Sequence, residues 1–240
     1  MELLANEAER LGVVVTPEQL ALFRRYHEEL MAWNRRVNLT RVTGREEVRR
    51  LHFLDSLTAV PLLDACLSGL AAQPRILDLG SGAGLPGIPV KLVRPAWRVI
   101  LLDSTRKRTA FLGHLIGLLG LRDVEVVTAR AEEAGRLPAY RERLDAVISR
   151  AVAPLSVLAE LCLPFVRLGG HMIAYKKGDI GAEIERAHRA LRALGGGTPR
   201  LHAVPEEVLP GQRCLVVVEK ISATPETYPR RPGVPARRSL

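Results

Sequence analysis

The sequence is poor in aromatic residues and cysteine and has no long apolar run. Aromatic residues make up 4% of the 240 residues although 47% are hydrophobic, so a core must consist of Leu, Val, Ile and Ala, as in buried parallel sheets. The three cysteines, Cys66, Cys162 and Cys214, lack C-x-x-C spacing, which favours buried small hydrophobes over ligands or disulfides. No apolar run approaches the roughly twenty residues of a membrane span, and the first residues lack a secretory signal's basic start. We therefore expect a cytoplasmic protein without a membrane segment.

Lysine is also scarce, yet the net charge is +9. Lysine occurs only at positions 91, 107, 176, 177 and 220, so arginine supplies most of the 35 basic residues. Arginine forms planar, bidentate contacts with phosphate, and a basic protein is predisposed to bind polyanions. A GC-rich or heat-adapted genome would produce the same composition, and composition alone does not separate the two explanations.

From residue 75 onward, short apolar segments alternate with helical patterns. We predict strands over residues 75–79, 98–102, 124–128, 144–149 and 171–175, and helices over 87–93, 106–119, 154–166 and 179–194. This alternation predicts a doubly wound, mostly parallel α/β sheet with right-handed crossovers. Two further strands, over 200–204 and 213–220, have no helix between them, which predicts a terminal hairpin and one antiparallel strand.

Residues 1 to 70 read as a helical extension. Thr16, Pro17 and Gln19 form a capping box with proline at the first helical position. Apolar residues then recur at helical spacing as far as Trp33, and a second helix is predicted over 46–63. The tail, residues 223–240, is rich in proline and arginine, and we expect it to be a loosely ordered basic arm.

Residues 75–87 are the most informative segment. An apolar strand runs into Asp78, and Gly80, Gly82 and Gly84 follow at alternate positions before a helix that carries Gly87. Glycine permits sharp turns at positive φ and lets a ligand approach main-chain N–H groups that a Cβ would shield. The segment therefore predicts a nucleoside-binding loop at the carboxyl end of the first strand.

The glycine spacing also indicates which nucleoside cofactor is bound. The dinucleotide pattern G-x-G-x-x-G fits poorly: counted from Gly80 the third glycine is Leu85, and counted from Gly82 the pattern crosses Pro86. The pattern D-x-G-x-G-x-G, beginning at Asp78, fits without interruption. It is typical of the first motif of the S-adenosylmethionine (SAM) methyltransferases, which this sequence resembles.

The ends of the later strands supply further candidates, because open α/β sheets bind ligands at the carboxyl ends of their strands. Asp103 ends the second strand, 23 residues after Gly80, which is where an acid binds the ribose hydroxyls. The alternative is that Asp103 caps the following helix. Ser104 and Thr105 either assist the cofactor contact or belong to that cap.

Ala131 and Glu132 lie in the loop after the third strand, and Arg150 follows the apolar run of the fourth strand. In resembling methyltransferases the loop at Ala131 and Glu132 contacts the adenine; the alternative is a helix start with favourable acids. Arg150 would hold an RNA phosphate, the guanine carbonyl or the cofactor carboxylate, or would be a surface arginine.

Longer segments resemble the glucose-inhibited division protein B family over nearly the whole chain. They are residues 33–40 (Trp-Asn-Arg-Arg-Val-Asn-Leu-Thr), 52–57 (His-Phe-Leu-Asp-Ser-Leu), 82–89 (Gly-Ala-Gly-Leu-Pro-Gly-Ile-Pro), 102–104, 149–151 and 228–235 (Tyr-Pro-Arg-Arg-Pro-Gly-Val-Pro). The resemblance implies a SAM-dependent methyltransferase for guanine N7 in 16S ribosomal RNA. It implies a seven-stranded Rossmann-like domain over 71–222, and cofactor contacts at Gly80, Leu85, Asp103, Ser104, Thr105, Ala131, Glu132 and Arg150.

The missing motifs agree with methylation of N7. The sequence has no Asn-Pro-Pro-Tyr or Asp-Pro-Pro-Tyr for an exocyclic amine and no Pro-Cys pair for a pyrimidine carbon. N7 of guanine already has a lone pair, so we predict direct in-line attack on the methyl group without a catalytic residue. His52 and Asp55 stand one helical turn apart, which favours a helix-surface pair over a catalytic one. No cluster has metal-ligand spacing, and none is assigned.

Basic pairs are the candidates for holding RNA, either as 16S ribosomal RNA or as the small ribosomal subunit, by a protein that is expected to be monomeric. The predicted contacts are Arg35, Arg36, Lys176, Lys177, Arg230 and Arg231. Each pair alone would also suit a solvated surface. The alternatives to this function are a SAM-dependent enzyme for a different RNA or a non-RNA acceptor, a non-enzymatic RNA-binding module, and an NAD-dependent oxidoreductase.

Overall fold

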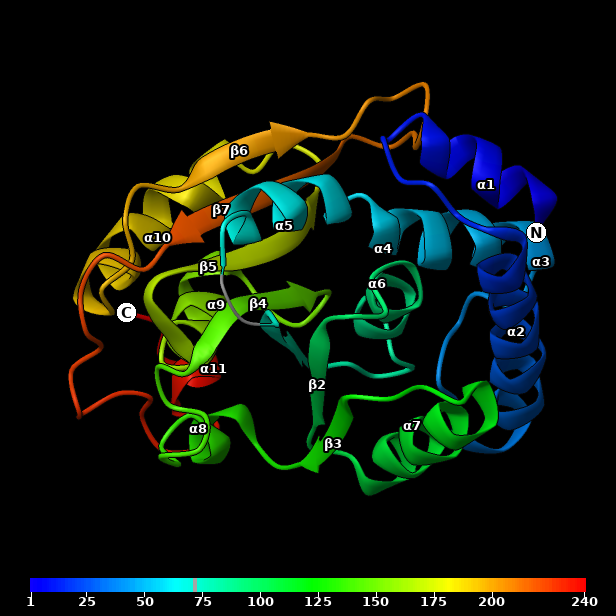
Figure 1. Cartoon of the computed structure of the whole chain (residues 1–240). Helices are drawn as coiled ribbons and strands as arrows, with labels where there is room; N and C mark the ends of the chain where they lie inside the picture. Colours follow the sequence, from blue (N-terminus) through cyan, green and yellow to red (C-terminus); the bar gives the residue numbers. More distant parts are fainter. Residues whose placement is uncertain (71–72) are drawn as a thin grey trace.

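A seven-stranded sheet forms the centre of the computed structural model, which describes residues 1–70 and 73–240 (Figure 1). The strands are β1 (Arg75–Leu79), β2 (Arg98–Asp103), β3 (Val124–Thr128), β4 (Leu144–Arg150), β5 (Val166–Lys177), β6 (Arg200–Ala203) and β7 (Arg213–Glu219). Their order is β3-β2-β1-β4-β5-β7-β6. β1 to β5 run parallel, whereas β7 is antiparallel to both β5 and β6. The predicted Rossmann-like sheet and its terminal hairpin are confirmed.

The central strands of the sheet are buried on both faces, so their side chains divide between two cores. Within β1, Ile76 packs into one core and Leu77 into the other, and both are fully buried. A strand covered on both sides reads as an unbroken apolar run rather than as an alternating one. This is why the sequence locates the central strands well.

The first core lies between the sheet and the N-terminal helices, together with α6 (Gly87–Val93) and α7 (Arg106–Leu119). α1 (Glu2–Glu9) and the long α2 (Pro17–Val37) stand at the edge of this layer (Figure 1). α2 begins as predicted, because the Thr16 hydroxyl accepts from the Gln19 N–H and the Gln19 side chain accepts from the Thr16 N–H. The extension thus shares its core with the sheet.

The single helix expected over residues 46–63 is wrong. The segment consists of α3 (Arg45–Glu47), the π-helical turn η1 (Val48–Leu54), α4 (Asp55–Leu57) and α5 (Val60–Leu67). Pro61 lies in the first turn of α5, and proline has no N–H with which to continue a helix that arrives from before it. Asp55 and Ser56 of α4, just before this break, are buried.

The second core lies under α8 (Ala131–Ala134), α9 (Leu155–Cys162) and α10 (Gly181–Ala193). The helix predicted over 154–166 is too long: α9 ends at Cys162, and Val166 already belongs to β5. Leu163 precedes Pro164, and a residue before proline is biased away from helical backbone. The apolar run of helix and strand is continuous here, so periodicity alone does not separate them.

The C-terminal tail is packed rather than loosely ordered, which corrects the expectation for residues 223–240. It crosses the outside of the second helical layer and ends in a short helix, α11 (Val234–Arg237), beside α9 (Figure 1). The side chains of Arg136 and Arg141 donate to its main-chain carbonyls. The tail is therefore part of the fold.

Among the described helices, none combines the length and apolar character that a bilayer crossing requires. The domain boundary predicted between residues 70 and 71 falls at residues 71–72, which lie outside the described residues.

Candidate cofactor site and its arginine network

The glycine loop connects β1 to α6 at the carboxyl edge of the sheet. Gly80 has a φ of 77°, and a Cβ built on it would lie 2.6 Å from a methyl group of Val152, so any other residue would be strained and crowded here. The N–H groups of Gly80 and Ser81 both donate to the Leu102 carbonyl at 2.8 and 3.0 Å. The loop is thereby fixed to the end of β2.

Asp78 lies beneath the loop and is completely buried. Its Oδ2 accepts from the Gly87 N–H at 2.9 Å, while Oδ1 has no partner among the described residues. A Cβ on Gly87 would lie 2.7 Å from Asp78 Oδ2 and 2.5 Å from Leu101, so glycine is needed for α6 to approach β1. Burial raises the pKa of Asp78 to about 7, against the lowering effect of its bond to Gly87. Asp78 thus holds the loop from below.

Asp103, at the end of β2, faces the loop. Its Oδ1 accepts from the Thr105 N–H at 2.8 Å, and its Oδ2 accepts from the Gly82 N–H at 3.0 Å. Arg108 Nη1 lies 3.3 Å from the same Oδ2. The N-cap of α7 is Thr105 and has no side-chain cap hydrogen bond, so Asp103 precedes the helix and does not cap it. The carboxylate lines a cavity, and the ribose contact stays a prediction.

That cavity, of about 370 Å³, opens beside the strand ends. Among the predicted cofactor residues, Gly80, Asp103, Ser104, Ala131 and Glu132 line it. Its other lining residues are Leu79, Leu102, Arg108, Ala129, Arg130, Ala151, Val152, Ala153, Val157, Leu161, Gly233 and Ala236. Most of these belong to segments far apart in the sequence.

The remaining predicted cofactor residues lie around the cavity rather than in its lining. Gly82, Gly84 and Leu85 belong to the glycine loop, whose Ala83 carbonyl accepts from the Tyr26 hydroxyl of α2 at 2.5 Å. Thr105 stands at the start of α7.

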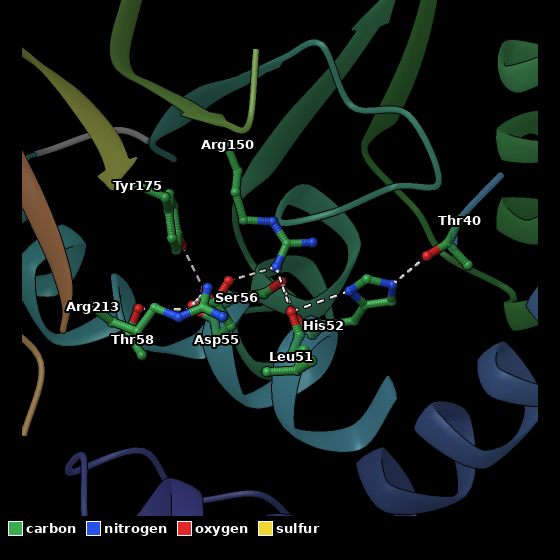
Figure 2. A network of polar contacts seen from close by, with 9 residues as sticks. All are labelled: Thr40, Leu51, His52, Asp55, Ser56, Thr58, Arg150, Tyr175 and Arg213. Atoms are coloured by element: carbon green, nitrogen blue, oxygen red, sulfur yellow. Dashed lines mark hydrogen bonds and ion pairs between the residues drawn. The ribbon is translucent and has the colours of Figure 1, made fainter. Parts of the chain in front are cut away.

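Arg150, the last residue of β4, belongs to a buried polar network on the side of the N-terminal helices (Figure 2). Its Nη1 donates to Asp55 Oδ2 at 2.7 Å and to the Leu51 carbonyl at 3.0 Å. The other oxygen of Asp55 accepts from Arg213 Nη1 at 3.1 Å, and the Tyr175 hydroxyl donates to the Ser56 carbonyl. Asp55 therefore joins the helical extension to β4 and β7, and the sequence pattern did not reveal it.

The interpretation of His52 and Asp55 as a surface pair is wrong, because the two side chains have different partners (Figure 2). His52 Nε2 lies 2.7 Å from the Thr40 hydroxyl, and Nδ1 lies 3.1 Å from the Leu51 carbonyl. Burial, and then the charge of Arg150, lower the pKa of His52 to about 4. The neutral ring can donate from Nδ1 and accept at Nε2, so His52 fixes the loop at Thr40.

The predicted RNA contacts fall into two groups. Arg35, Arg36, Lys177 and Arg231 are exposed. Lys176 and Arg230 are instead engaged within the protein: Lys176 Nζ lies 2.6 Å from Glu183 Oε1, and Arg230 pairs with buried Glu160. Their charges are already paired, so the exposed group is the better candidate for RNA.

The cavity suits a nucleoside. Its volume lies within the range of small-ligand sites. A carboxylate at Asp103 can accept from hydroxyl hydrogens, apolar Leu79, Leu102 and Val157 can contact a base, and Gly80 leaves room beside the main chain. The residues present therefore fit the adenosyl part of SAM.

The parallel sheet, the glycine loop and the acid at the end of β2 define a SAM-dependent methyltransferase of the Rossmann-like class. A SAM-dependent O-methyltransferase from Thermotoga maritima shares this fold, with a TM-score of 0.53 over 82% of this chain and 72% of its own, at 14% identity. Residues 19–209 match the family GidB, rRNA small subunit methyltransferase G, and the chain belongs to that family.

Two relatives support this assignment over the full chain. A ribosomal RNA small subunit methyltransferase G from Roseiflexus sp. (strain RS-1) is 47% identical over 242 residues, which cover 100% of both chains. Another, from Dehalococcoides mccartyi (strain BAV1), is 44% identical over 96% of this chain and 95% of its own. The family resemblance deduced from the sequence is confirmed.

Proposed function

We propose that this protein uses SAM to methylate N7 of a guanine in 16S ribosomal RNA. The proposal rests on membership of the rRNA small subunit methyltransferase G family. The family match covers residues 19–209, which are 191 of the 240 residues. The fold and the cavity at the carboxyl edge of the sheet support the use of SAM. We further propose that it acts in the cytoplasm, where its substrate is found, and as a monomer.

The residues that would hold the cofactor are Gly80, Asp103, Ala131 and Glu132, all of which line the cavity. When bound there, SAM supplies an electrophilic methyl group. N7 of guanine has a free lone pair, so no side chain needs to remove a proton from it. The protein's contribution is then to orient the guanine and to stabilise the positive charge that appears on it.

Arg150 is the side chain best placed to orient the acceptor. Asp55 and the Leu51 carbonyl hold its Nη1, while its Nε and Nη2 make no hydrogen bond to the described part of the chain. These free donors suit a guanine carbonyl or an RNA phosphate. Arg150 ends β4 and is not among the residues that line the cavity, so its proposed role is to act as a fixed donor to the acceptor rather than to the cofactor.

A methyl-transfer assay with radiolabelled SAM tests the proposal. The purified protein is offered 16S ribosomal RNA, the small ribosomal subunit, an unrelated RNA of equal length and small-molecule acceptors. We expect label only in 16S RNA or in the RNA of the small subunit, and, after digestion, only in 7-methylguanosine. Label in a different nucleoside would reject N7, and label in the unrelated RNA or a small acceptor would favour the alternative, a SAM-dependent enzyme with another substrate.

A further inference from the structure

The C-terminal tail forms one wall of the cofactor cavity. Gly233 and Ala236 line it together with Ala131 and Glu132 of α8 and Val157 of α9. Gly233 lies 76 positions after Val157, the nearest of these in sequence, so the wall exists only because the tail folds back onto the domain. In Figure 1 the red helix α11 lies between α8 and α9.

A buried ion pair fixes the tail just before this wall. Glu160 of α9 is 1% exposed, and its two oxygens accept from the Nε and Nη2 groups of Arg230 at 2.5 to 3.1 Å. The main-chain N–H of Arg230 donates to the same carboxylate at 2.8 Å. A bidentate pair with an added main-chain bond sets both position and orientation.

Two further arginines hold the tail by its main chain. Arg136 Nη2 donates to the carbonyl of Pro229 at 2.6 Å, and Arg141 Nη1 donates to the carbonyl of Tyr228 at 2.8 Å. Main-chain acceptors are available whatever the side chains are, so these contacts fix the path of the chain. Both arginines follow α8, which is itself a wall of the cavity.

A single hydrogen bond connects the tail to a predicted cofactor residue. The N–H of Gly233 donates to Glu132 Oε1 at 2.8 Å. Glu132 is 8% exposed and lines the cavity, so this bond fixes its carboxylate at the cavity surface. Within the described part of the chain, the second oxygen of the carboxylate accepts no hydrogen bond, which leaves it for a ligand.

We propose that the tail is a part of the cofactor site: Gly233 and Ala236 contact the bound nucleoside, and Gly233 acts as a positioning residue for Glu132. The inference rests on the proposed use of SAM. Ligand binding and the order of the tail then depend on the same contacts, so the bound ligand stabilises the tail. A change in the tail likewise weakens ligand binding without weakening the rest of the fold.

An alanine-to-leucine substitution in the wall tests the proposal. Ala236 is exposed and lines the cavity, so Ala236→Leu places a larger side chain into the ligand space without disturbing the core. Ala223→Leu is the matched control, since Ala223 is also exposed in the tail and does not line the cavity. Calorimetry measures the affinity for S-adenosylhomocysteine, and thermal unfolding without ligand checks the fold.

We expect Ala236→Leu to weaken S-adenosylhomocysteine binding at least tenfold with an unchanged unfolding temperature, while Ala223→Leu binds like the wild type. Hydrogen exchange of the wild type should also slow over residues 229–238 when the ligand is added. Equal affinity in all three proteins, or unchanged exchange in the tail, overturns the proposal while leaving SAM binding intact. Absence of binding by the wild type overturns the proposed function together with this inference.

Discussion

Asp78 accepts a hydrogen bond at the end of the glycine loop, and its burial disfavours the charged form of its carboxyl. Its carboxyl is fully buried and has one hydrogen-bond donor within the described part of the chain, the Gly87 N–H. Burial raises its pKa from 3.8 to about 7. The folded protein therefore retains the Asp78 proton between these pH values, whereas the unfolded chain releases it.

The sign of the resulting pH dependence follows directly. Unfolding releases a proton between pH 3.8 and about 7, so rising pH favours unfolding, and the contribution of Asp78 to stability is full below the unfolded pKa and lost above about 7. We expect Asp78→Asn to remove this contribution. The unfolding temperature of the wild type relative to the variant should fall as pH rises from 4 to 8. Parallel pH profiles for the two proteins would contradict this assignment to Asp78. The lowered pKa of His52 makes stability rise with pH instead, but both proteins contain His52, so its effect cancels in the comparison.

Asp55 provides a second prediction at this scale. It is 3% exposed and bridges Arg150 and Arg213, so Asp55→Asn leaves two largely buried cations without their counter-charge. We expect a loss of roughly 3 kcal/mol in the free energy of unfolding, measured with urea. Asp64→Asn is the control: Asp64 pairs with Arg94 at a more exposed site, and its loss should stay below about 1 kcal/mol. Equal losses of unfolding free energy in the two variants would show that the buried network stabilises the fold no more than the exposed pair does.

The sequence predicted Gly80 and Asp103 near the site because they lie where strands end, and strand ends meet at one edge. Glu132 was predicted from the role of the loop after the third strand in resembling methyltransferases. Asp55, Gly233 and Ala236 were not predicted. Their roles depend on partners about a hundred residues away, and no local spacing reports such contacts. Which predicted residues touch the cofactor stays a prediction.

At the scale of elements, the contact of α6 with β1 and β2 depends on a single missing side chain. A Cβ on Gly87 would lie 2.7 Å from Asp78 Oδ2 of β1 and 2.5 Å from Leu101 Cδ2 of β2. Gly87→Ala must push α6 away from the sheet, which should cost about 1 to 3 kcal/mol of unfolding free energy.

Gly113→Ala is the matched control on α7. A Cβ there meets nothing within 4 Å, so alanine should stabilise the helix by about 0.5 to 1 kcal/mol through its better propensity. Opposite signs in urea unfolding support close packing at Gly87. Stabilisation by both substitutions would contradict it.

The elements themselves were predictable to different degrees. β1 to β3, α6 and α7 lie where the alternation of apolar runs and helical patterns places them, because short apolar runs and helical periodicity are local signatures. The segments over 46–63 and 154–166 differ, since a proline interrupts each apolar pattern at a point that periodicity does not register. The packed tail was missed because its order comes from Glu160 and Arg136 in other elements.

At the scale of the molecule, the position of charge matters more than the total of +9. Lys177 ends β5 and is exposed at the carboxyl edge, while Arg122 is exposed in the turn before β3, at the opposite edge. If RNA binds at the carboxyl edge, Lys177→Ala should weaken binding and reduce the slope of log Kd against log salt by about 1. Arg122→Ala removes the same charge and should leave both unchanged. Equal effects in filter-binding titrations would show that only net charge matters.

The helical extension and the tail meet the sheet at the same functional edge from opposite faces. Asp55 connects the extension to Arg150, and Glu132 connects the tail to the cavity. The tail therefore supplies Gly233 and Ala236 to the lining of the cavity, whereas the extension reaches this edge through the partner of Arg150.

The most direct test of this account is to map N7-methylguanosine in the 16S ribosomal RNA of cells that lack this protein. We predict that one guanine loses its N7 methyl group, that the wild-type gene restores it, and that a gene carrying Asp103→Ala restores it poorly. An unchanged set of N7-methylated guanines in the deletion strain would contradict the account.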